Sequence, residues 1–425
     1  MRSAAARSSG SERSDRPAIQ QASGAAVRSE ACAATPASSS SSRTSSTEGR
    51  SNPASWANEA IHSSLVIAAS LVPRRSGGPR RAIQGSLRTM LDRLRRPLRD
   101  LRISVTDRCN LRCPYCMPRE VFGGDFPFLA REELLSFEEI TRIVRVMSAQ
   151  GVTRIRLTGG EPLLRRDLER LVEMLAGVDG VSEIALTTNG LLLARSAQRL
   201  RDAGLDRVTV SLDALDARAL RSMSDAPVSP ERILDGIEAA GRAGLTPVKV
   251  NMVVRRGRND HCVLDMADRF RHRAEILRFI EFMDVGSSNG WSPGEVVPAR
   301  EILAAIGARW PLEALEPSRE GEVATRYRYR DGAGEIGLIH SVSEPFCGGC
   351  TRARLSADGQ LFTCLFARHG HDLRGLLRGG AGADELERSL HGIWTARTDR
   401  YSAERSLAEQ PTPQAPKVEM SYIGG

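Results

Sequence analysis

The sequence predicts an α/β fold with a parallel sheet, and two observations support this prediction. Short runs rich in Val, Ile, Leu and Thr recur six times between residues 101 and 283, as is typical of strands. Amphipathic stretches lie between these runs. Such alternation generates parallel strands joined by crossover helices. The pattern therefore predicts either a doubly wound sheet or a partial barrel, and in both architectures the chemistry belongs at the carboxyl ends of the strands.

The elements can be taken in chain order. Ser136 stands three residues before Glu139 in a capping-box pattern, and Gly151 closes the stretch, so a helix is expected over 136–151. The six expected strands are LRISV (101–105), RIRLT (154–158), EIALTT (183–188), RVTVSL (207–212), VKVNMVV (248–254) and ILRFIEFM (276–283).

Composition and the pattern of expected strands and helices divide the chain into three parts. Residues 1–89 are of low complexity and rich in Arg, Ser and Ala, so we expect a disordered leader. This composition fits an organelle transit peptide, or a start-site artefact if translation begins at Met90. Residues 90–297 hold the strand and helix repeats. Residues 298–425 form a smaller unit with its own cysteines and an antiparallel hairpin over 322–341.

Charge and composition argue against two classes of function. The formal net charge is +8, but twelve arginines against five acidic residues place +7 of it in residues 1–89. The remainder is nearly neutral and aromatic content is only 4%, which argues against nucleic-acid binding. The longest early apolar run, 63–72, is too short to cross a bilayer, so no membrane segment is expected.

A first cysteine triplet directly follows the first expected strand. Cys109, Cys113 and Cys116 have the spacing C-x3-C-x2-C. Three thiols are one short of a closed zinc site, and no fourth Cys or His lies nearby. Inert buried cysteines do not suit so polar and proline-broken a loop. A 4Fe-4S cluster accounts for the count, because three thiolates bind three irons and leave the fourth iron open.

This triplet, with Tyr115 before its last cysteine, resembles the radical S-adenosylmethionine superfamily. The stretch LTGGEPLLR (157–165) is similar to the Gly-Gly-Glu-Pro loop of that superfamily. The resemblance implies that the open iron chelates the methionine group of S-adenosylmethionine, which the reduced cluster cleaves to a 5′-deoxyadenosyl radical. It also implies a set of cofactor contacts: Tyr115, Gly160, Ser211 and Met283.

A second triplet repeats the missing fourth ligand. Cys347, Cys350 and Cys364 have the spacing C-x2-C-x13-C, and the chain ends in SYIGG. Together these features resemble the molybdenum cofactor biosynthesis protein A family, the GTP 3′,8-cyclases. From the second triplet we expect a second cluster with an open iron, facing the first across the barrel mouth. The resemblance implies a partial (β/α)6 barrel with a C-terminal extension that carries this second 4Fe-4S cluster. It further implies attack of the GTP ribose C3′ radical on guanine C8, and a Gly-Gly tail that reaches the active site.

The resemblance also implies a set of GTP contacts: Arg102, Arg156, Thr187, Lys249, Arg352, Ala353 and Arg354. The residues add independent support. Arg352 and Arg354 alternate, so an extended backbone points both to one face. Lys249 is one of only two lysines and lies inside an apolar strand, where an ammonium group needs a partner such as phosphate. Arg278 is a weaker candidate, and Cys262 is expected to pack as a small hydrophobe. No catalytic side chain is singled out.

The expected partners are GTP, a downstream cyclic pyranopterin monophosphate synthase and a flavodoxin- or ferredoxin-type electron donor, with the chain a monomer or homodimer. The expected compartment is the cytoplasm, or the mitochondrial matrix if the leader is a true transit peptide. Two alternatives remain: a peptide-modifying radical enzyme with an auxiliary cluster, and a zinc-stabilised nucleic-acid-binding protein.

Overall fold

One sheet organises the part of the chain that the structure describes. The computed structural model describes residues 89–405 and 416–424, so the expected leader lies, except for residue 89, outside the described residues. The strand order of the sheet is β12-β11-β10-β1-β2-β3-β4-β5-β6-β9-β8-β7. Its central strands are β1 (Asp100–Ser104), β2 (Arg154–Thr158), β3 (Glu183–Thr188), β4 (Arg207–Ser211), β5 (Lys249–Val254) and β6 (Ile276–Glu281).

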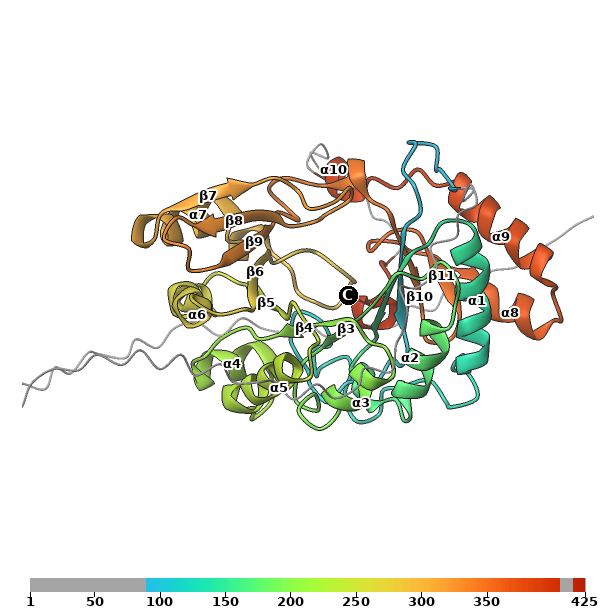
Figure 1. Ribbon diagram of the computed structural model, residues 1–425, viewed down its shortest axis with the longest axis horizontal. Helices are drawn as coiled ribbons and strands as arrows, with labels where there is room; N and C mark the ends of the chain where they lie inside the picture. Colours follow the sequence, from blue (N-terminus) through green and yellow to red (C-terminus); the bar gives the residue numbers. More distant parts are fainter. Residues whose placement is uncertain (1–88, 406–415, 425) are drawn as a thin grey trace, which may run out of the picture. The chain divides into compact units, whose positions relative to one another are not determined.

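These six strands are parallel and neighbour one another in chain order. Right-handed crossovers between strands in that order place the helices that connect them on the same face, and the sheet curves around its other face (Figure 1). This settles the choice between the two expected architectures in favour of a partial barrel. The helices are α1 (Phe137–Ala149), α2 (Leu168–Ala176), α3 (Ala197–Asp202), α4 (Ala217–Ser224), α5 (Pro230–Arg242), α6 (Val263–Phe270), α7 (Ala299–Arg309), α8 (Leu373–Arg378), α9 (Ala383–Thr395), α10 (Tyr401–Arg405) and α11 (Met420–Ile423).

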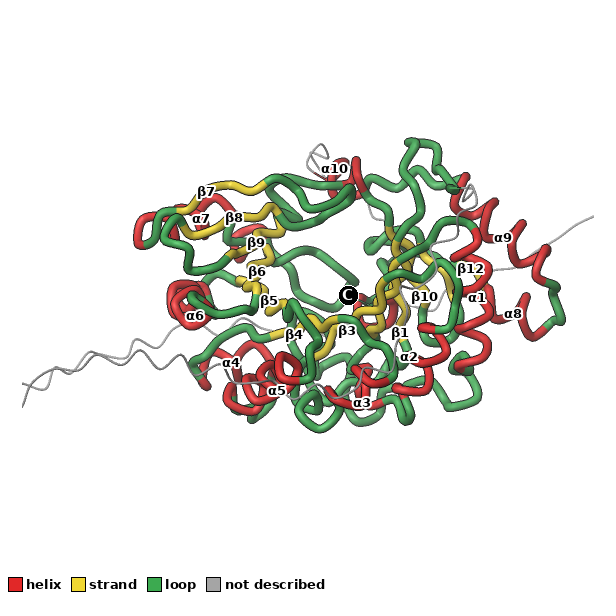
Figure 2. The backbone as a smooth tube through the Cα atoms, in the orientation of Figure 1, coloured by secondary structure: helices red, strands yellow, loops and turns green. Residues whose placement is uncertain are grey.

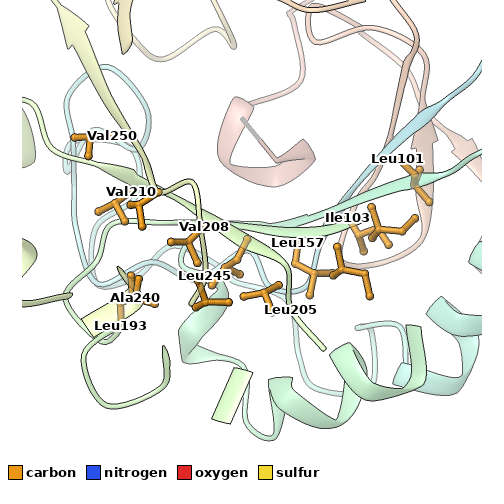
Figure 3. Packing of buried hydrophobic residues seen from close by; sticks show 14 of the residues in the cluster. Leu101, Ile103, Leu157, Leu193, Leu205, Val208, Val210, Ala240, Leu245 and Val250 are labelled. Carbon is orange, nitrogen blue, oxygen red and sulfur yellow. The ribbon is translucent and has the colours of Figure 1, made fainter. Parts of the chain in front are cut away.

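The local sequence signals explain the barrel elements well. Each of the six predicted strands forms within two residues of its expected bounds. Helix α1 begins with the predicted capping box, in which the Ser136 side chain accepts from the Glu139 amide and the Glu139 side chain accepts from the Ser136 amide. Apolar side chains on the outer face of the strands pack against the helices, and Figure 3 shows Leu101, Leu157 and Val208 among them.

The C-terminal part of the chain extends both edges of the barrel. Its strands are β7 (Leu312–Leu315), β8 (Thr325–Tyr329), β9 (Glu335–Ile339), β10 (Arg352–Leu355), β11 (Gln360–Phe362) and β12 (His371–Asp372). Strands β8 and β9 form the predicted hairpin, and β9 pairs in parallel with β6. Strand β10 pairs in parallel with β1 at the opposite edge (Figure 2). Both edges of the barrel are therefore covered by strands from residues 312–372.

Among the helices that the structure describes, none is both long and apolar enough to cross a membrane. Cys262 is buried in the hydrophobic core at the start of α6, as predicted.

Candidate active site

The interior of the barrel holds a cavity of about 360 Å³. Its walls include inward-facing side chains of the barrel strands and of β10. All six cysteines of the two predicted triplets line it: Cys109, Cys113, Cys116, Cys347, Cys350 and Cys364. All are free thiols. Two cysteine groups that are distant in sequence thus share one cavity.

The first triplet lies on the loop that follows β1. A tight turn brings the amide of Cys116 to 2.9 Å from the carbonyl of Cys113. Arg112 fixes the loop from outside the cavity, because its guanidinium donates to the carbonyls of Cys109 at 2.9 Å and Phe122 at 2.7 Å. Burial, followed by repulsion from the neighbouring thiols, raises the pKa of Cys113. Coordination to a metal cluster reverses such a shift, because it favours the thiolate.

The predicted Gly-Gly-Glu-Pro loop packs directly against the cysteine loop. The amide of Gly160 donates to the carbonyl of Thr106 at 2.9 Å, and the amide of Glu161 donates to that of Arg108 at 2.8 Å. A Cβ atom on Gly160 would lie 2.3 Å from the Arg108 carbonyl oxygen, and one on Gly159 would lie 2.4 Å from that of Thr106. Both glycines are therefore required by contact with the chain itself, a reason that motif reasoning did not supply.

The Glu161 carboxylate joins the ends of β2 and β3. It accepts from the Thr188 hydroxyl at 2.7 Å and the Asn189 amide at 2.8 Å. Burial raises the pKa of Glu161 to about 7 despite these donors. The Asn189 side chain then donates to Asn110 at 2.8 Å, beside the first cysteine. Two strand ends and the cysteine loop are thereby held in one network.

The expected cofactor contacts Tyr115, Ser211 and Met283 also line the cavity, as does Gly160. The Tyr115 hydroxyl donates to Asp213 at 2.7 Å, and the Val253 amide donates to the other oxygen of Asp213 at 2.9 Å. Burial raises the pKa of Asp213 to about 6. Asp213 thus ties the cysteine loop to the ends of β4 and β5. No sequence motif singled out this residue.

The second triplet is held by two arginines that the sequence did not single out. Arg96 donates to the Cys347 carbonyl at 2.9 Å and to the Asp399 carbonyl at 2.8 Å. Arg397 donates to the Cys350 carbonyl at 2.9 Å and contacts its sulfur at 3.2 Å. Burial raises the pKa of Cys350, but the positive charges of Arg352 and Arg397 outweigh it and bring the pKa to about 6.

The two triplets lie at opposite ends of the barrel interior rather than facing each other across its mouth. The first triplet follows the carboxyl end of β1. The second precedes β10, whose first residue, Arg352, pairs in register with Asp100 at the amino end of β1. The expectation of two clusters across the mouth was therefore wrong, because β10 adds to the sheet in parallel with β1.

A row of arginines crosses the cavity between the triplets. Arg102 is in register with Arg156 on β2 and with Arg354 on β10, so the three side chains share the inner face. Burial, followed by repulsion from Arg354 and Arg352, lowers the pKa of Arg102. In the described part of the chain, no carboxylate forms an ion pair with Arg102, Arg156 or Arg354.

The cationic surface continues across the other strands. Arg156 donates to the hydroxyls of Thr187 and Thr209, each at 3.2 Å. Burial lowers the pKa of Lys249 to about 7, and repulsion from Arg278 adds to the effect. Arg278, the weaker candidate, donates to Asn251 at 3.0 Å. The cavity lining contains ten basic and six acidic side chains, so it favours an anionic ligand.

Residues 352–354 divide between two faces of the sheet. Arg352 and Arg354 both line the cavity, as their alternation predicted. Ala353 is 0% exposed and packs in the hydrophobic core on the opposite face. The expected contact between Ala353 and GTP is therefore not available to its side chain.

The described residues do not form a ready-made site for a single metal ion. Within residues 89–405 and 416–424, no three His, Cys, Asp or Glu side chains lie close enough to hold one ion. The thiolates of a four-iron cluster bind different irons and are more widely spaced than the ligands of one ion.

Comparisons with known proteins agree with this geometry. The profile of the Radical SAM superfamily matches residues 103–270, and that of Molybdenum Cofactor Synthesis C matches residues 275–403. A GTP 3′,8-cyclase of Acidothermus cellulolyticus is 54% identical, covering 79% of this chain and 98% of that protein. One from Staphylococcus carnosus is 48% identical, covering 80% and 100%.

The solved structure of Streptococcus suis SuiB bound to S-adenosylmethionine has a TM-score of 0.51 at 14% identity. It covers 73% of this chain and 68% of its own, and supports the fold alone. The identities of 54% and 48% to the two GTP 3′,8-cyclases, over nearly their whole length, establish the family. The chain belongs to the radical S-adenosylmethionine superfamily and, within it, to the GTP 3′,8-cyclases of molybdenum cofactor biosynthesis.

Proposed function

We propose that this chain converts GTP to 3′,8-cyclo-7,8-dihydro-GTP inside the barrel cavity, with one 4Fe-4S cluster on each cysteine triplet. The observation that carries this proposal is the cationic surface between the two triplets. A nucleoside triphosphate brings about four negative charges, and the cavity lining has four more basic than acidic side chains.

The first triplet would hold the cluster that binds S-adenosylmethionine. When bound and reduced, this group supplies the 5′-deoxyadenosyl radical that removes the ribose C3′ hydrogen. The protein's contribution is placement. Arg112, Glu161 and Asn189 hold the cysteine loop against the strand ends. Tyr115, Gly160, Ser211 and Met283 border the space beside that loop and are the proposed cofactor contacts.

The second triplet would hold the second cluster at the far end of the cavity. Arg96 and Arg397 fix this triplet through the carbonyls of Cys347 and Cys350. GTP would then lie between the two clusters. Its phosphates would contact Arg102, Arg156, Lys249, Arg352 and Arg354, since guanidinium groups bind phosphate in a bidentate manner. Thr187 would contribute its hydroxyl.

The wider setting is part of the same proposal. Residues 90–297 form the radical barrel, and residues 298–425 carry the second cluster and part of the GTP site. An electron donor of flavodoxin or ferredoxin type reduces the first cluster. The product passes to a cyclic pyranopterin monophosphate synthase.

One incubation tests the function directly. The anaerobically reconstituted protein is given GTP, dithionite and S-adenosylmethionine, and the products are identified by mass spectrometry. We expect 5′-deoxyadenosine and a cyclised nucleotide with the mass of GTP. Zinc without labile sulfide would contradict the cluster assignment, whereas 5′-deoxyadenosine without any nucleotide product would favour the peptide-modifying alternative.

Two cysteine variants separate the clusters. Cys113→Ala should abolish reductive cleavage of S-adenosylmethionine, because the first cluster loses a ligand. Cys350→Ala should retain some cleavage but lose cyclisation. Normal cyclisation by the Cys350→Ala variant would show that the second triplet does not serve the substrate.

A further inference from the structure

The described end of the chain, residues 416–424, forms a tail that enters the barrel. At its tip, Gly424 has a φ of 70°, and a Cβ atom there would lie 2.3 Å from Thr158 Cγ2 and 3.1 Å from Ser104 Oγ. Arg354 donates to the Gly424 carbonyl and, at 3.5 Å, to that of Ile423. The tip therefore lies against the carboxyl ends of β1 and β2 and shares an arginine with the cationic surface.

The middle of the tail docks on the loop after β6. Glu419 accepts from the Ser287 amide at 3.0 Å and from the Ser288 hydroxyl at 2.9 Å. Gly286 has a φ of 69°, and a Cβ atom there would lie 2.2 Å from Glu419 Oε2. A residue without a side chain is thus needed in the loop to let Glu419 approach.

The root of the tail is held by Asp284 in the same loop. Lys417 Nζ donates to the Asp284 carboxylate and to its carbonyl, both at 2.7 Å. Their side chains are only 14% and 12% exposed, so solvent screens this ion pair weakly. The Val418 amide donates to the Ala367 carbonyl at 3.0 Å, which fixes the next residue.

Asp284 also binds two residues of α10, which precedes the tail in the sequence. The Tyr401 hydroxyl donates to its carboxylate at 2.5 Å, and Arg405 forms a second ion pair with it. One carboxylate thus joins α10, the tail and the loop. Next to Asp284 in this loop lies Met283, whose carbonyl accepts from the Asn289 side chain at 2.9 Å.

We propose that Asp284 is a positioning residue that sets how deeply the tail enters the barrel, through its ion pair with Lys417. Lys417 lies seven residues before Gly424, so release of this pair frees the tip from its close contacts with Thr158 and Arg354. Because Asp284 adjoins Met283, the same contact aligns the tail with the expected cofactor site. The expected effect on GTP cyclisation rests on the proposed function, whereas the role of Asp284 in docking the tail does not.

The expected effect is large for one contact. Lys417 makes two charge-assisted hydrogen bonds to Asp284 in a weakly solvated setting, and loss of such bonds lowers the docked population roughly 10- to 100-fold. Lys417→Met removes the charge and keeps much of the side-chain volume. Lys417→Arg keeps the charge and should retain most of the docking. Arg405→Met is the matched control, because it removes the other cationic partner of Asp284 without altering the tail.

Docking is measured by hydrogen exchange on the reconstituted full-length protein. Exchange of the tail amides, including that of Val418, should rise roughly 10- to 100-fold in Lys417→Met and much less in Arg405→Met and Lys417→Arg. In the GTP incubation, Lys417→Met should yield less cyclised nucleotide per 5′-deoxyadenosine, while GTP affinity changes little because the phosphate-binding arginines are intact.

Unchanged tail exchange in Lys417→Met, or an equal rise in Arg405→Met, would overturn the positioning role. So would increased exchange with an unchanged ratio of cyclised product to 5′-deoxyadenosine. If the wild-type protein makes no cyclised nucleotide, the proposed function fails, and the exchange measurement still decides whether Asp284 positions the tail.

Discussion

The contact between the Gly-Gly-Glu-Pro loop and the cysteine loop leads to a prediction for Gly160→Ala. The added Cβ would lie 2.3 Å from the Arg108 carbonyl oxygen and 2.5 Å from its carbonyl carbon. Both atoms belong to the backbone, so neither can rotate away. Ordinary contact requires the loops to separate by about 1 Å. The 2.8 Å hydrogen bond from Glu161 to Arg108 would then lengthen beyond hydrogen-bond distance.

These two effects give the magnitude. Overpacking in a fixed site costs about 1–3 kcal/mol, and a lost hydrogen bond costs about 1 kcal/mol more. A destabilisation of roughly 2–4 kcal/mol corresponds to a fall in Tm of roughly 3–6 °C for a folded unit of this size. Displacement of the cysteine loop by about 1 Å should also slow cleavage of S-adenosylmethionine on the order of 100-fold.

The assay combines a thermal melt followed by circular dichroism with the rate of 5′-deoxyadenosine formation in the reconstituted protein. Gly307→Ala is the control, because a Cβ atom at this position in α7 meets nothing within 4 Å. It should be neutral or stabilise the protein by about 0.5–1 kcal/mol. If Gly160→Ala melted with the wild type and cleaved the cofactor at the wild-type rate, the argument from close contact would be refuted.

Two further predictions concern the cationic surface. Arg156→Met should weaken GTP binding roughly 10- to 100-fold, because a charge-assisted hydrogen bond to phosphate is lost. It should also raise Tm in the absence of GTP, because a buried cation is removed. Calorimetry measures the binding and thermal melts measure the Tm, with Arg170→Met, at an exposed position, as the control. Burial lowers the pKa of Lys249 to about 7 from 10.5, so between these values the unfolded chain binds more protons and stability should rise with pH. Lys249→Met should lose this rise in pH-dependent melts, and an identical pH profile would contradict the assignment.

The sequence predicted the features that depend on neighbouring residues. The six barrel strands, the Ser136 capping box and the β8–β9 hairpin all follow from local composition and spacing. The cysteines could be found from their spacing, and Arg352 and Arg354 from their alternation. Each of these signals lies within a few residues.

The features that the sequence did not predict depend on contacts between segments that are distant along the chain. Nothing near Arg96 or Arg397 indicates that they hold the second triplet, because their partners lie far away along the chain. The parallel addition of β10 to β1 was equally hidden, and it determines that the triplets lie at opposite ends of the barrel. Residues 352–354 were predicted together as GTP contacts. Because side chains alternate along a strand, Ala353 in the middle points to the face opposite Arg352 and Arg354.

The pairing of β1 with β10 has a consequence for biosynthesis. Asp100 is 251 residues from its hydrogen-bond partner Thr351. At about 5–20 residues per second, the ribosome needs roughly 12–50 s after β1 to deliver that partner. Throughout this interval the nascent chain carries an unpaired, apolar strand edge, of the kind that chaperones recognise. The cluster proposed for the second triplet could assemble only after this wait, because Arg397, which donates to the Cys350 carbonyl, is translated later still.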